Sequence, residues 1–432
     1  MQEAPWFYNL ISLGGLIALV LVARLSGLGR GPLAWRTLLW GLGLQLLIGA
    51  LVFALPSGRY GLLAVNDAMV ALLSYSQAGI RFLFGPLADQ PGEPHYMGFM
   101  LALHALPTIV FFMALTAALY QLGILQRVVR LFSRLFVKTL GASGAESLGV
   151  ASLMFVGVES AGMVRPFLPK FTRSEFFTLL TAAMATVASS TLGVYVMTLK
   201  GGFPNIAGHL ISASLLSAPA ALVVAKLMEP ETGEPLTAGQ VVDPALGKYG
   251  GLMEAVIAGS NDGVKLVVGV AALLLSFLSI LALFNGLLGW LTGLVGLGEV
   301  SLQGILGWLG YPFALAMGVP PADAATVGSL LGQRVLVTEI PAYLQLGELL
   351  SHGGLTYSRS ALIASYALCG FAHVASVAIF LGGFGALAPG RIGEWSRLGL
   401  KALWAATLAT MMTGCVAGLF AHGGATQLGL GQ

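Results

Sequence analysis

The stretch GASGAESLGVASLMFVGVESAG, residues 141–162, consists mostly of small and apolar residues, as a membrane segment does. It nevertheless holds two acids, Glu146 and Glu159, thirteen positions apart. Because a charged side chain at the centre of a bilayer costs at least ~3 kcal/mol, such acids are expected to have a structural or functional task. The stretch therefore predicts a segment at membrane depth that is not an ordinary spanning helix.

The whole chain has the composition of a membrane protein. Of its 432 residues, 57% are hydrophobic and 9% are charged, and its mean hydropathy is +0.87, whereas globular domains carry about 25% charged residues. The net charge is only +3, without the basic clusters that a nucleic-acid partner requires. Cys369 and Cys415 lie in apolar sequence and are predicted to be core residues, not a disulfide or a metal site. The N-terminal apolar run lacks a basic flank and is expected to stay as an anchor.

Eight apolar runs are long enough to cross a membrane as helices. They cover residues 6–23, 37–55, 96–122, 174–199, 206–228, 264–297, 357–383 and 402–419. The polar stretch 229–248 is too short for a soluble domain and is predicted to be a loop. The sequence has no GxxxxGK[ST] motif and so no built-in ATPase.

The basic residues predict the orientation, because cytoplasmic loops carry an excess of Lys and Arg. Most of them fall on one side if both chain termini lie outside, while Arg59, Lys200 and Arg334 are single exceptions. The set on the inside is Arg24, Arg30, Arg36, Arg127, Arg130, Arg134, Lys138, Lys170, Arg173, Lys226, Arg391, Arg397 and Lys401. We therefore expect an integral protein of a bacterial cytoplasmic (inner) membrane with outside termini.

Two segments are predicted to be interfacial helices. Arg127, Arg130, Arg134 and Lys138 are spaced by three and four residues and form one face of a helix; Val128, Leu131, Phe132, Leu135 and Phe136 form the other. Residues 66–84 form the second candidate, since Asp67, Gln77 and Arg81 interrupt its apolar sequence.

Two further segments fit neither a loop nor a span: residues 141–169 and residues 318–346. Each is rich in Gly, Ser and Ala, contains acids and ends near a proline. The topology leaves each on one side of the membrane, so each is predicted to be a re-entrant hairpin of two half-helices, entering from opposite sides. Each precedes a span with a polar cluster, Ser189-Ser190-Thr191 or His373 with Ser376. This order predicts an inverted repeat with a site near the midplane.

The tips of such hairpins offer groups that can bind a solute or an ion. Free N–H groups of one half-helix favour anions and polar acceptors, free C=O groups of another coordinate cations, and carboxylates bind solute hydroxyls or carry protons. Glu159, Glu339 and His373 are therefore candidate site residues. Glu146 is either a site residue or a cap of backbone N–H groups, and Asp262 with Lys265 has the spacing of a helical ion pair.

Several blocks resemble the concentrative nucleoside transporter family, from about residue 60 to the C-terminus and in the expected order. The blocks are GASGAESL (141–148), VRPFLPKFTRSEFF with MATVASSTLGVY (164–195), SNDGVKL with ALFNGLL (260–288), YPFALAMGVPPADAATVGSLLGQRVLVTEIPAY (311–343) and SYALCGFAHVASVAIFLGGFGALAPGRIGEWSRLGLKAL (365–403). The resemblance implies a homotrimer whose mobile part, built from the hairpins and their following helices, moves like an elevator and is coupled to a cation. It also implies that Glu339 binds ribose and that Phe371 and Ser376 belong to the substrate site.

The sequence differs from the family pattern at residues that the resemblance assigns to substrate and cation binding. Where the family has Gly-Gln-Thr-Glu-Ala, this chain has Gly157-Val158-Glu159-Ser160-Ala161, so the base-binding glutamine is valine and the glutamate has moved back by one position. Leu153 stands where the family has a sodium-coordinating asparagine, and His373 replaces another asparagine. The backbone of Val156 and the hydroxyls of Ser189 and Ser190 remain as cation ligands.

The predicted function is cation-coupled uptake of a nucleoside or a related ribose-bearing solute, with the proton favoured over sodium and no cofactor. The predicted substrate site is Val158, Glu159, Ser160, Glu339, Phe371, His373 and Ser376. The alternatives are transport of another polar solute on the same fold, or a channel or binding protein that does not concentrate its ligand. An enzyme is not expected, because the sequence has no HExxH motif and no clear nucleophile–base pair.

The predicted organisation has five parts. They are scaffold and interfacial helices (1–140), the first hairpin with two spans (141–228), a cytoplasmic loop (229–260), one span (261–300) and the second hairpin with the last two spans (301–432).

Overall fold

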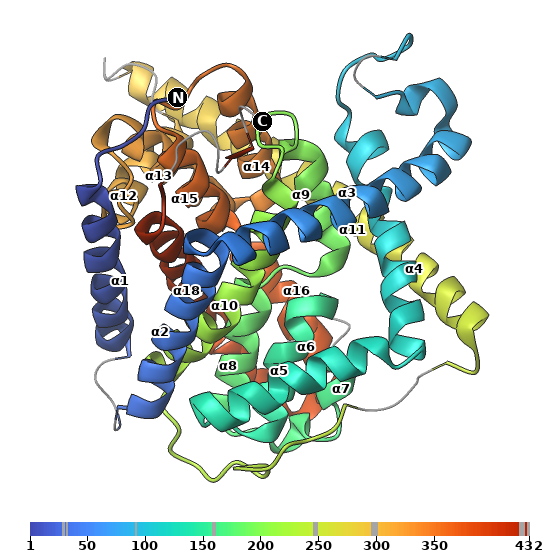
Figure 1. Cartoon of the computed structure of the whole chain (residues 1–432), viewed down its shortest axis with the longest axis vertical. Coiled ribbons are helices and arrows are strands. Elements are labelled where there is room, and N and C mark those ends of the chain that lie inside the picture. Colours follow the sequence, from blue (N-terminus) through green and yellow to red (C-terminus); the bar gives the residue numbers. More distant parts are fainter. Residues whose placement is uncertain are drawn as a thin grey trace.

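The computed structural model describes residues 1–27, 31, 33–90, 93–157, 161–244, 249–294, 301–422 and 428–429. In this part the chain is helical apart from loops and one isolated bridge between Gln2 and Tyr357 (Figure 1). The helices are α1 (Phe7–Ser26), α2 (Trp35–Gly49) with a π-helical end (Ala50–Ala54), α3 (Pro56–Phe84), α4 (Thr108–Gln121) after a π-helical turn (Leu101–Ala105), α5 (Ile124–Leu140), α6 (Gly144–Val156), α7 (Ala161–Val164), α8 (Arg173–Ala185), α9 (Ser189–Leu199), α10 (Ile206–Met228), α11 (Leu252–Leu294), α12 (Leu302–Ala316), α13 (Pro321–Leu336), α14 (Glu339–Ser351), α15 (Ser358–Leu368), α16 (Val374–Leu387), α17 (Ile392–Ser396) and α18 (Gly399–Leu419).

Seven helical segments of the described chain are long and apolar enough to cross a membrane. They are Phe7–Ser26, Trp35–Ala54, Leu101–Gln121, Arg173–Leu199, Ile206–Met228, Leu252–Leu294 and Gly399–Leu419. The predicted span 357–383 is not among them, because it is broken into α15 and α16, each too short to span alone. The pair α12–α13 is also apolar but bends by 119°, so the count rises to eight if that pair is one span.

The two broken segments, α8–α9 and α15–α16, meet at their breaks. Gly370 lies in the second break with φ +153°, and a Cβ atom there would come within 2.8 Å of the carbonyl oxygen of Ala185, the last residue of α8. A side chain would therefore collide with the other broken segment, and the positive φ is costly for any other residue. Glycine at this position lets the two irregular backbones approach each other, with α18 on the far side.

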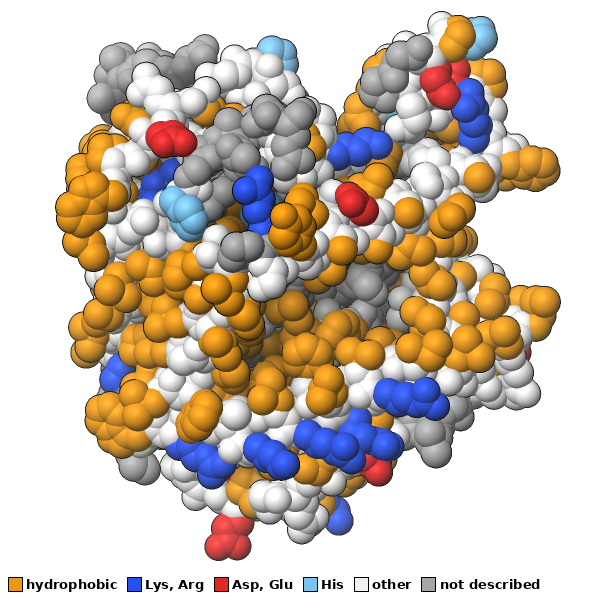
Figure 2. Space-filling view, in the orientation of Figure 1, with side chains coloured by type: hydrophobic (Ala, Val, Ile, Leu, Met, Phe, Trp, Pro, Cys, Tyr) orange, Lys and Arg blue, Asp and Glu red, His pale blue; other side chains and the backbone are white. Residues whose placement is uncertain are grey.

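Basic side chains gather at one end of the molecule, here called the basic end. It is the end at which α5 lies across the bundle, while the N-terminus lies at the opposite end (Figure 1). Figure 2 shows a broad hydrophobic band across the middle and a row of Lys and Arg below it. This distribution is the one a membrane protein presents to a bilayer. Arg30 and Lys248 lie outside the described residues.

The helix predicted from the basic spacing is confirmed as α5, and part of its predicted apolar face is exposed, as in a helix that lies on a membrane surface; that location stays a prediction. Leu131 is 66% exposed and Leu135 is 39% exposed. The residues turned inward are Leu125, Gln126, Val129, Ser133, Phe136, Val137 and Leu140. The helix is thus apolar on two sides, one against the protein and one exposed.

Other boundaries differ from those predicted. The helix predicted from residue 66 begins ten positions earlier, at Pro56, because proline is favoured in the first turn. The last predicted loop residues, up to 260, are helical, since α11 begins at Leu252. With 43 residues, α11 is roughly 65 Å long at 1.5 Å per residue, about twice the thickness of a hydrocarbon core.

One order of elements occurs twice along the chain. The first copy runs from α5 through two short arms, α6 and α7, and the broken segment α8–α9 to the long helix α10. The second runs from α12 through α13 and α14 and the broken segment α15–α16 to α18. The long helices of the two copies, α10 and α18, pack against each other.

Candidate functional site

A cavity of about 100 Å³ lies between the breaks of α8–α9 and α15–α16 and the start of α14. Residues of α4 and α11 also line it. Its polar lining comes from the starts of α9, α14 and α16, and its apolar lining from α4, α9, α11, α14 and α16. The polar residues are Ser190, Thr191, Thr338, Glu339, His373 and Ser376; the apolar ones include Ile109, Val194, Leu266, Val270, Leu273, Leu274, Ile340, Phe371, Ile379 and Phe380. Such a cavity suits a ligand with one polar and one apolar part.

Among the lining residues that the structure describes, Glu339 is the only carboxylate, and it is 3% exposed. It opens α14 directly after Thr338, whose extended backbone (φ −163°, ψ 174°) ends the preceding turn. A carboxylate in the first turn of a helix is stabilised by the free N–H groups there. Its Oε1 accepts a hydrogen bond of 2.6 Å from the Tyr195 hydroxyl, which comes from α9.

Two polar atoms of this lining have no hydrogen-bond partner among the described residues. They are Oε2 of Glu339 and Oγ1 of Thr338, both buried. Nε2 of His373 lies 3.3 Å from Oε2 without meeting hydrogen-bond geometry. Because a buried polar atom without a partner costs about 1–3 kcal/mol, these atoms are available to a polar group of a ligand.

His373 is the N-cap of α16, and this role assigns its ring nitrogens. Nδ1 accepts a hydrogen bond of 3.1 Å from the backbone N–H of Ser376. Neutral imidazole with Nδ1 as an acceptor carries its proton on Nε2, the atom that lies toward Glu339. Protonation of Nδ1 would break the cap, so the structure favours the neutral ring. The Ser376 hydroxyl donates back to the His373 carbonyl at 2.6 Å.

The structure brings together four of the predicted substrate residues: Glu339, Phe371, His373 and Ser376 all line the cavity. The other three, Val158, Glu159 and Ser160, lie outside the described residues, although Gly157 directly before them lines the cavity. Phe371 lies edge-on to His373 with 6.4 Å between ring centroids.

The predicted cation residues lie at the end of α6 and the start of α9. Ser190 lines the cavity. Ser189 does not; its hydroxyl donates to the Phe155 carbonyl at 2.7 Å and lies 3.3 Å from Oγ1 of Thr116. Val156 is the last residue of α6, and Leu153 is 1% exposed in the same helix. Ser189 therefore joins the start of α9 to the Phe155 carbonyl near the end of α6.

Tyr195, Thr338 and the apolar wall of α11 were not predicted, and Thr191 was predicted only as part of a polar cluster and not as a site residue. Tyr195 follows Thr191 by four positions, so the helical spacing of SSTLGVY could have placed both on one face. Nothing in the sequence of α11 distinguishes its cavity-facing leucines from its exposed ones.

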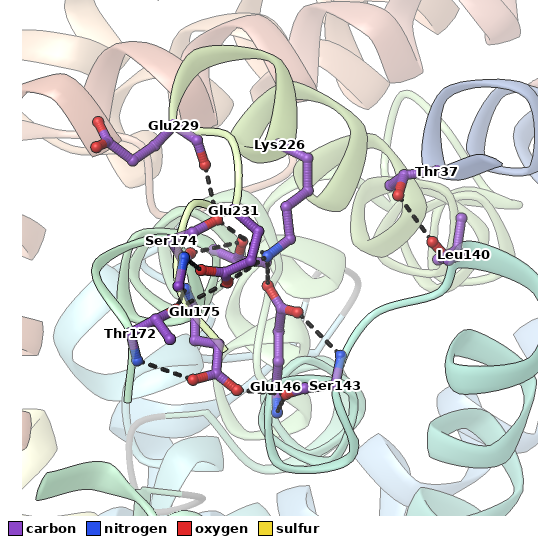
Figure 3. Close-up of polar contacts among 12 residues, drawn as sticks. Thr37, Leu140, Ser143, Glu146, Thr172, Ser174, Glu175, Lys226, Glu229 and Glu231 are labelled. Carbon is purple, nitrogen blue, oxygen red and sulfur yellow. Dashed lines mark hydrogen bonds and ion pairs between the residues drawn. The ribbon is translucent and has the colours of Figure 1, made fainter. Parts of the chain in front are cut away.

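Glu146 is a cap, as one of its two predicted roles requires, and it is not part of the cavity. It forms a capping box with Ser143: the Ser143 hydroxyl accepts from the Glu146 N–H, and the Glu146 carboxylate accepts from the Ser143 N–H. Its other oxygen lies 2.7 Å from Nζ of Lys226, which comes from the end of α10 (Figure 3). Both carboxylate oxygens are thus paired at the basic end.

A second capping box adjoins the first. Thr172 and Glu175 cap α8 in the same way, and the Ser143 hydroxyl donates to Glu175 at 2.5 Å. Lys226 also donates to the Ser174 hydroxyl at 3.0 Å and lies 3.7 Å from Glu231 of the following loop (Figure 3). One ammonium therefore ties the first arm, α8 and the loop to α10.

Family models match most of the chain. The model of the Na+ dependent nucleoside transporter N-terminus matches residues 14–87, nucleoside recognition matches 102–201, and the Na+ dependent nucleoside transporter C-terminus matches 209–418.

Individual relatives and a solved structure agree with these matches. An uncharacterized transporter of Haemophilus influenzae is 38% identical, over 97% of this chain and 99% of its own length. Solute carrier family 28 member 3 of Mus musculus is 35% identical over 95% of this chain and 59% of its own length. The structure of CNTnw in an inward-facing substrate-bound state superposes with a TM-score of 0.88 and 36% identity, over 96% of this chain and 98% of that chain. The resemblance drawn from the sequence is confirmed, and the chain belongs to the family of Na+-dependent, or concentrative, nucleoside transporters, which are integral membrane transporters and not enzymes.

Proposed function

We propose that this protein carries nucleosides across the membrane, with the ribose held at Glu339 and the base against the apolar wall. The observation that carries the proposal is the pair of unpartnered buried oxygens, Glu339 Oε2 and Thr338 Oγ1, at the polar end of the cavity. Ribose hydroxyls can donate to a carboxylate, and charge-assisted hydrogen bonds of this kind are strong.

The apolar end supports the assignment of the base. Phe371 and the residues Leu266, Val270, Leu273 and Leu274 of α11 offer contact area, and among the described lining residues of that wall none offers a side-chain hydrogen bond. A flat heteroaromatic ring can pack there through its faces. Recognition at this end then depends on shape, so purine and pyrimidine nucleosides are both accepted.

A competition panel tests the substrate class. Uptake of labelled uridine into proteoliposomes is measured with an excess of adenosine, cytidine, ribose, uracil or an unrelated polar solute such as proline. We expect both nucleosides to compete, and ribose and uracil alone to compete weakly. Competition by proline but not by nucleosides would contradict the proposal. Equilibration without accumulation against a gradient would indicate a channel instead.

We also propose that the coupling ion is a proton, although the family is described as Na+ dependent. The support is Leu153, which offers no side-chain oxygen at a position where sodium needs one of several ligands, and the Ser189 hydroxyl, which already donates to a carbonyl. His373 is poorly suited as carrier because its cap favours the neutral ring. This leaves Glu339 and Glu159, the latter outside the described residues.

The coupling ion is tested by imposing one gradient at a time. With sodium absent, an inward proton gradient should drive accumulation of uridine, and a sodium gradient at fixed pH should not. Accumulation driven by sodium alone would overturn proton coupling and make the α6 carbonyls with Ser189 and Ser190 the sodium site.

The architecture proposed for transport has eight spans, the broken pair α15–α16 being one of them, and two re-entrant hairpins, α6–α7 and α13–α14, in an inverted repeat. It is supported by the repeated order of elements and by the packing of α15 and α16 along α18. The hairpin units (141–228 and 301–432) then move as an elevator against scaffold helices from 1–140 and 261–300 in a homotrimer. The basic end, including the loop between α10 and α11, faces the cytoplasm, and both termini lie outside a bacterial inner membrane.

A further inference from the structure

Arg334 is a buried charge that the proposed transport mechanism does not use. Its side chain is 0% exposed, in the last turn of α13. No carboxylate forms an ion pair with it in the part of the chain that the structure describes, and its Nε and Nη2 have no hydrogen-bond partner there. Burying an unpaired guanidinium is strongly unfavourable, so burying an apolar side chain at this position would cost less free energy. The charge is therefore expected to serve the adjoining site.

The one nitrogen of Arg334 that does bond joins three elements. Nη1 donates to the carbonyl of Ala367 at 2.5 Å and to the hydroxyl of Thr410 at 2.7 Å. Ala367 lies in the last turn of α15, and because the helix ends at Leu368 its carbonyl has no N–H partner within the helix. A cation favours such a helix end. Arg334 thus caps the broken helix from α13 and fastens both to α18.

The segment that follows this cap builds one wall of the substrate cavity. After Leu368 the chain leaves the helix, and it resumes helical geometry only after His373, the N-cap of α16. Phe371 and His373 of this break line the cavity opposite Glu339, which opens α14 five positions after Arg334.

We propose that Arg334 is a positioning residue of the substrate site: by capping α15 from α13, it holds Phe371 and His373 in register with Glu339. The proposal rests on the proposed function of that cavity. Arg334 does not touch the cavity lining itself and acts through the break. If the cap is lost, the break loosens, Phe371 and His373 move relative to Glu339, and substrate affinity falls while the helices stay packed.

The cysteines provide a test that does not depend on the substrate. The chain has two, and both are free and buried: Cys369 in the break and Cys415 in α18. In a Cys415→Ala background, the rate of N-ethylmaleimide labelling measures opening of the break. We expect Arg334→Gln to raise this rate at least tenfold and Arg334→Lys, which keeps the charge and one donor, to raise it less. In a Cys369→Ala background, Arg334→Gln should leave the labelling of Cys415 unchanged.

The second readout is transport. In proteoliposomes, Arg334→Gln should raise the KM for uridine about tenfold or more with a smaller change in the maximal rate, and Arg334→Lys should recover part of the loss. Thr410→Val, which removes one acceptor and keeps the charge, should have the weakest effect. Equal labelling of Cys369 in variant and parent, or equal increases at Cys369 and Cys415, would overturn the positioning role. Failure of the unmodified protein to bind any nucleoside, with the Cys369 result intact, would instead contradict only the proposed function.

Discussion

The basic end and the cavity each hold a buried glutamate in the first turn of a short helix, and the two are used differently. Glu146 is 1% exposed and has a partner for each oxygen, the Ser143 N–H and Lys226. Glu339 is 3% exposed; its Oε1 accepts a hydrogen bond from Tyr195, whereas its Oε2 has no hydrogen bond and only the His373 ring at 3.3 Å. A carboxylate with all its partners supplied by the protein holds elements together, whereas one with a free oxygen in a cavity is ready for a ligand.

The largest effect is expected at Glu339. Glu339→Gln replaces a carboxylate by a neutral amide that fits the same space, so the charge-assisted hydrogen bonds to ribose are lost. Because such bonds contribute about 1.5–3 kcal/mol each, nucleoside uptake should fall by a factor of about 100 or more. Uptake into proteoliposomes measures the loss, and the melting temperature should change little.

The matched control is Glu348→Gln, on the exposed side of the same helix. It makes the same chemical change without touching the cavity, so uptake should remain at the level of the unmodified protein. Normal uptake by Glu339→Gln would contradict the different roles assigned to Glu146 and Glu339, since the free oxygen of Glu339 would then have no role in binding.

The second effect concerns stability at the basic end. Lys226→Met leaves Glu146 buried without its ion-pair partner, and breaking a buried pair in this way costs about 3–5 kcal/mol. We expect a large fall in melting temperature and an unchanged KM for the protein that remains folded. Adding Glu146→Gln to Lys226→Met should recover part of the stability, because the unpaired charge is then removed. A raised KM in the folded Lys226→Met protein would show that this cluster also shapes the cavity.

The helices could be predicted from the sequence more accurately than the contacts between them. Long apolar runs and the spacing of Arg127, Arg130, Arg134 and Lys138 indicated helices that the structure has, because periodicity reports which face is apolar. The break in residues 357–383 was missed, since LCGFAHVAS remains apolar through the break and the cause is tertiary: Gly370 meets the end of α8.

The site was predictable where a polar residue stands in apolar sequence. Glu339 and His373 stood out for this reason, and both line the cavity. Tyr195 and Arg334 did not, because a tyrosine fits any membrane helix, and the sequence alone makes Arg334 look like an exception to the charge bias. Their roles depend on contacts across 144 and 76 positions of the chain, to Glu339 and to Thr410, which no local pattern encodes.

The smallest effect is expected from a third glutamate, Glu229, at the surface of the basic end just after α10. Burial acts to raise its pKa, but hydrogen bonds and ion pairs with Lys401 and Arg173 outweigh it and lower the pKa below the ordinary value of 4.5. The Glu229 oxygens lie 2.5 Å from Nζ of Lys401 and 2.7 Å from Nε of Arg173. Since the pKa is lowered on folding, these bonds stabilise the protein fully above about pH 4.5 and are lost as the pH falls through the lower folded value.

Glu229→Gln should therefore lower the melting temperature slightly at pH 7, and this difference should shrink as the pH falls below about 4.5 and through the lower folded pKa of Glu229. Arg173 is 50% exposed and Lys401 is 31% exposed, so solvent screening limits the contribution to about 0.5–1 kcal/mol. High salt should reduce it further. Glu234→Gln, at an exposed position of the same loop, is the control and should leave the melting temperature at pH 7 unchanged. An equal loss in both variants would assign the effect to loop charge in general, whereas a loss only in Glu229→Gln places it in the bonds that join α8, α10 and α18.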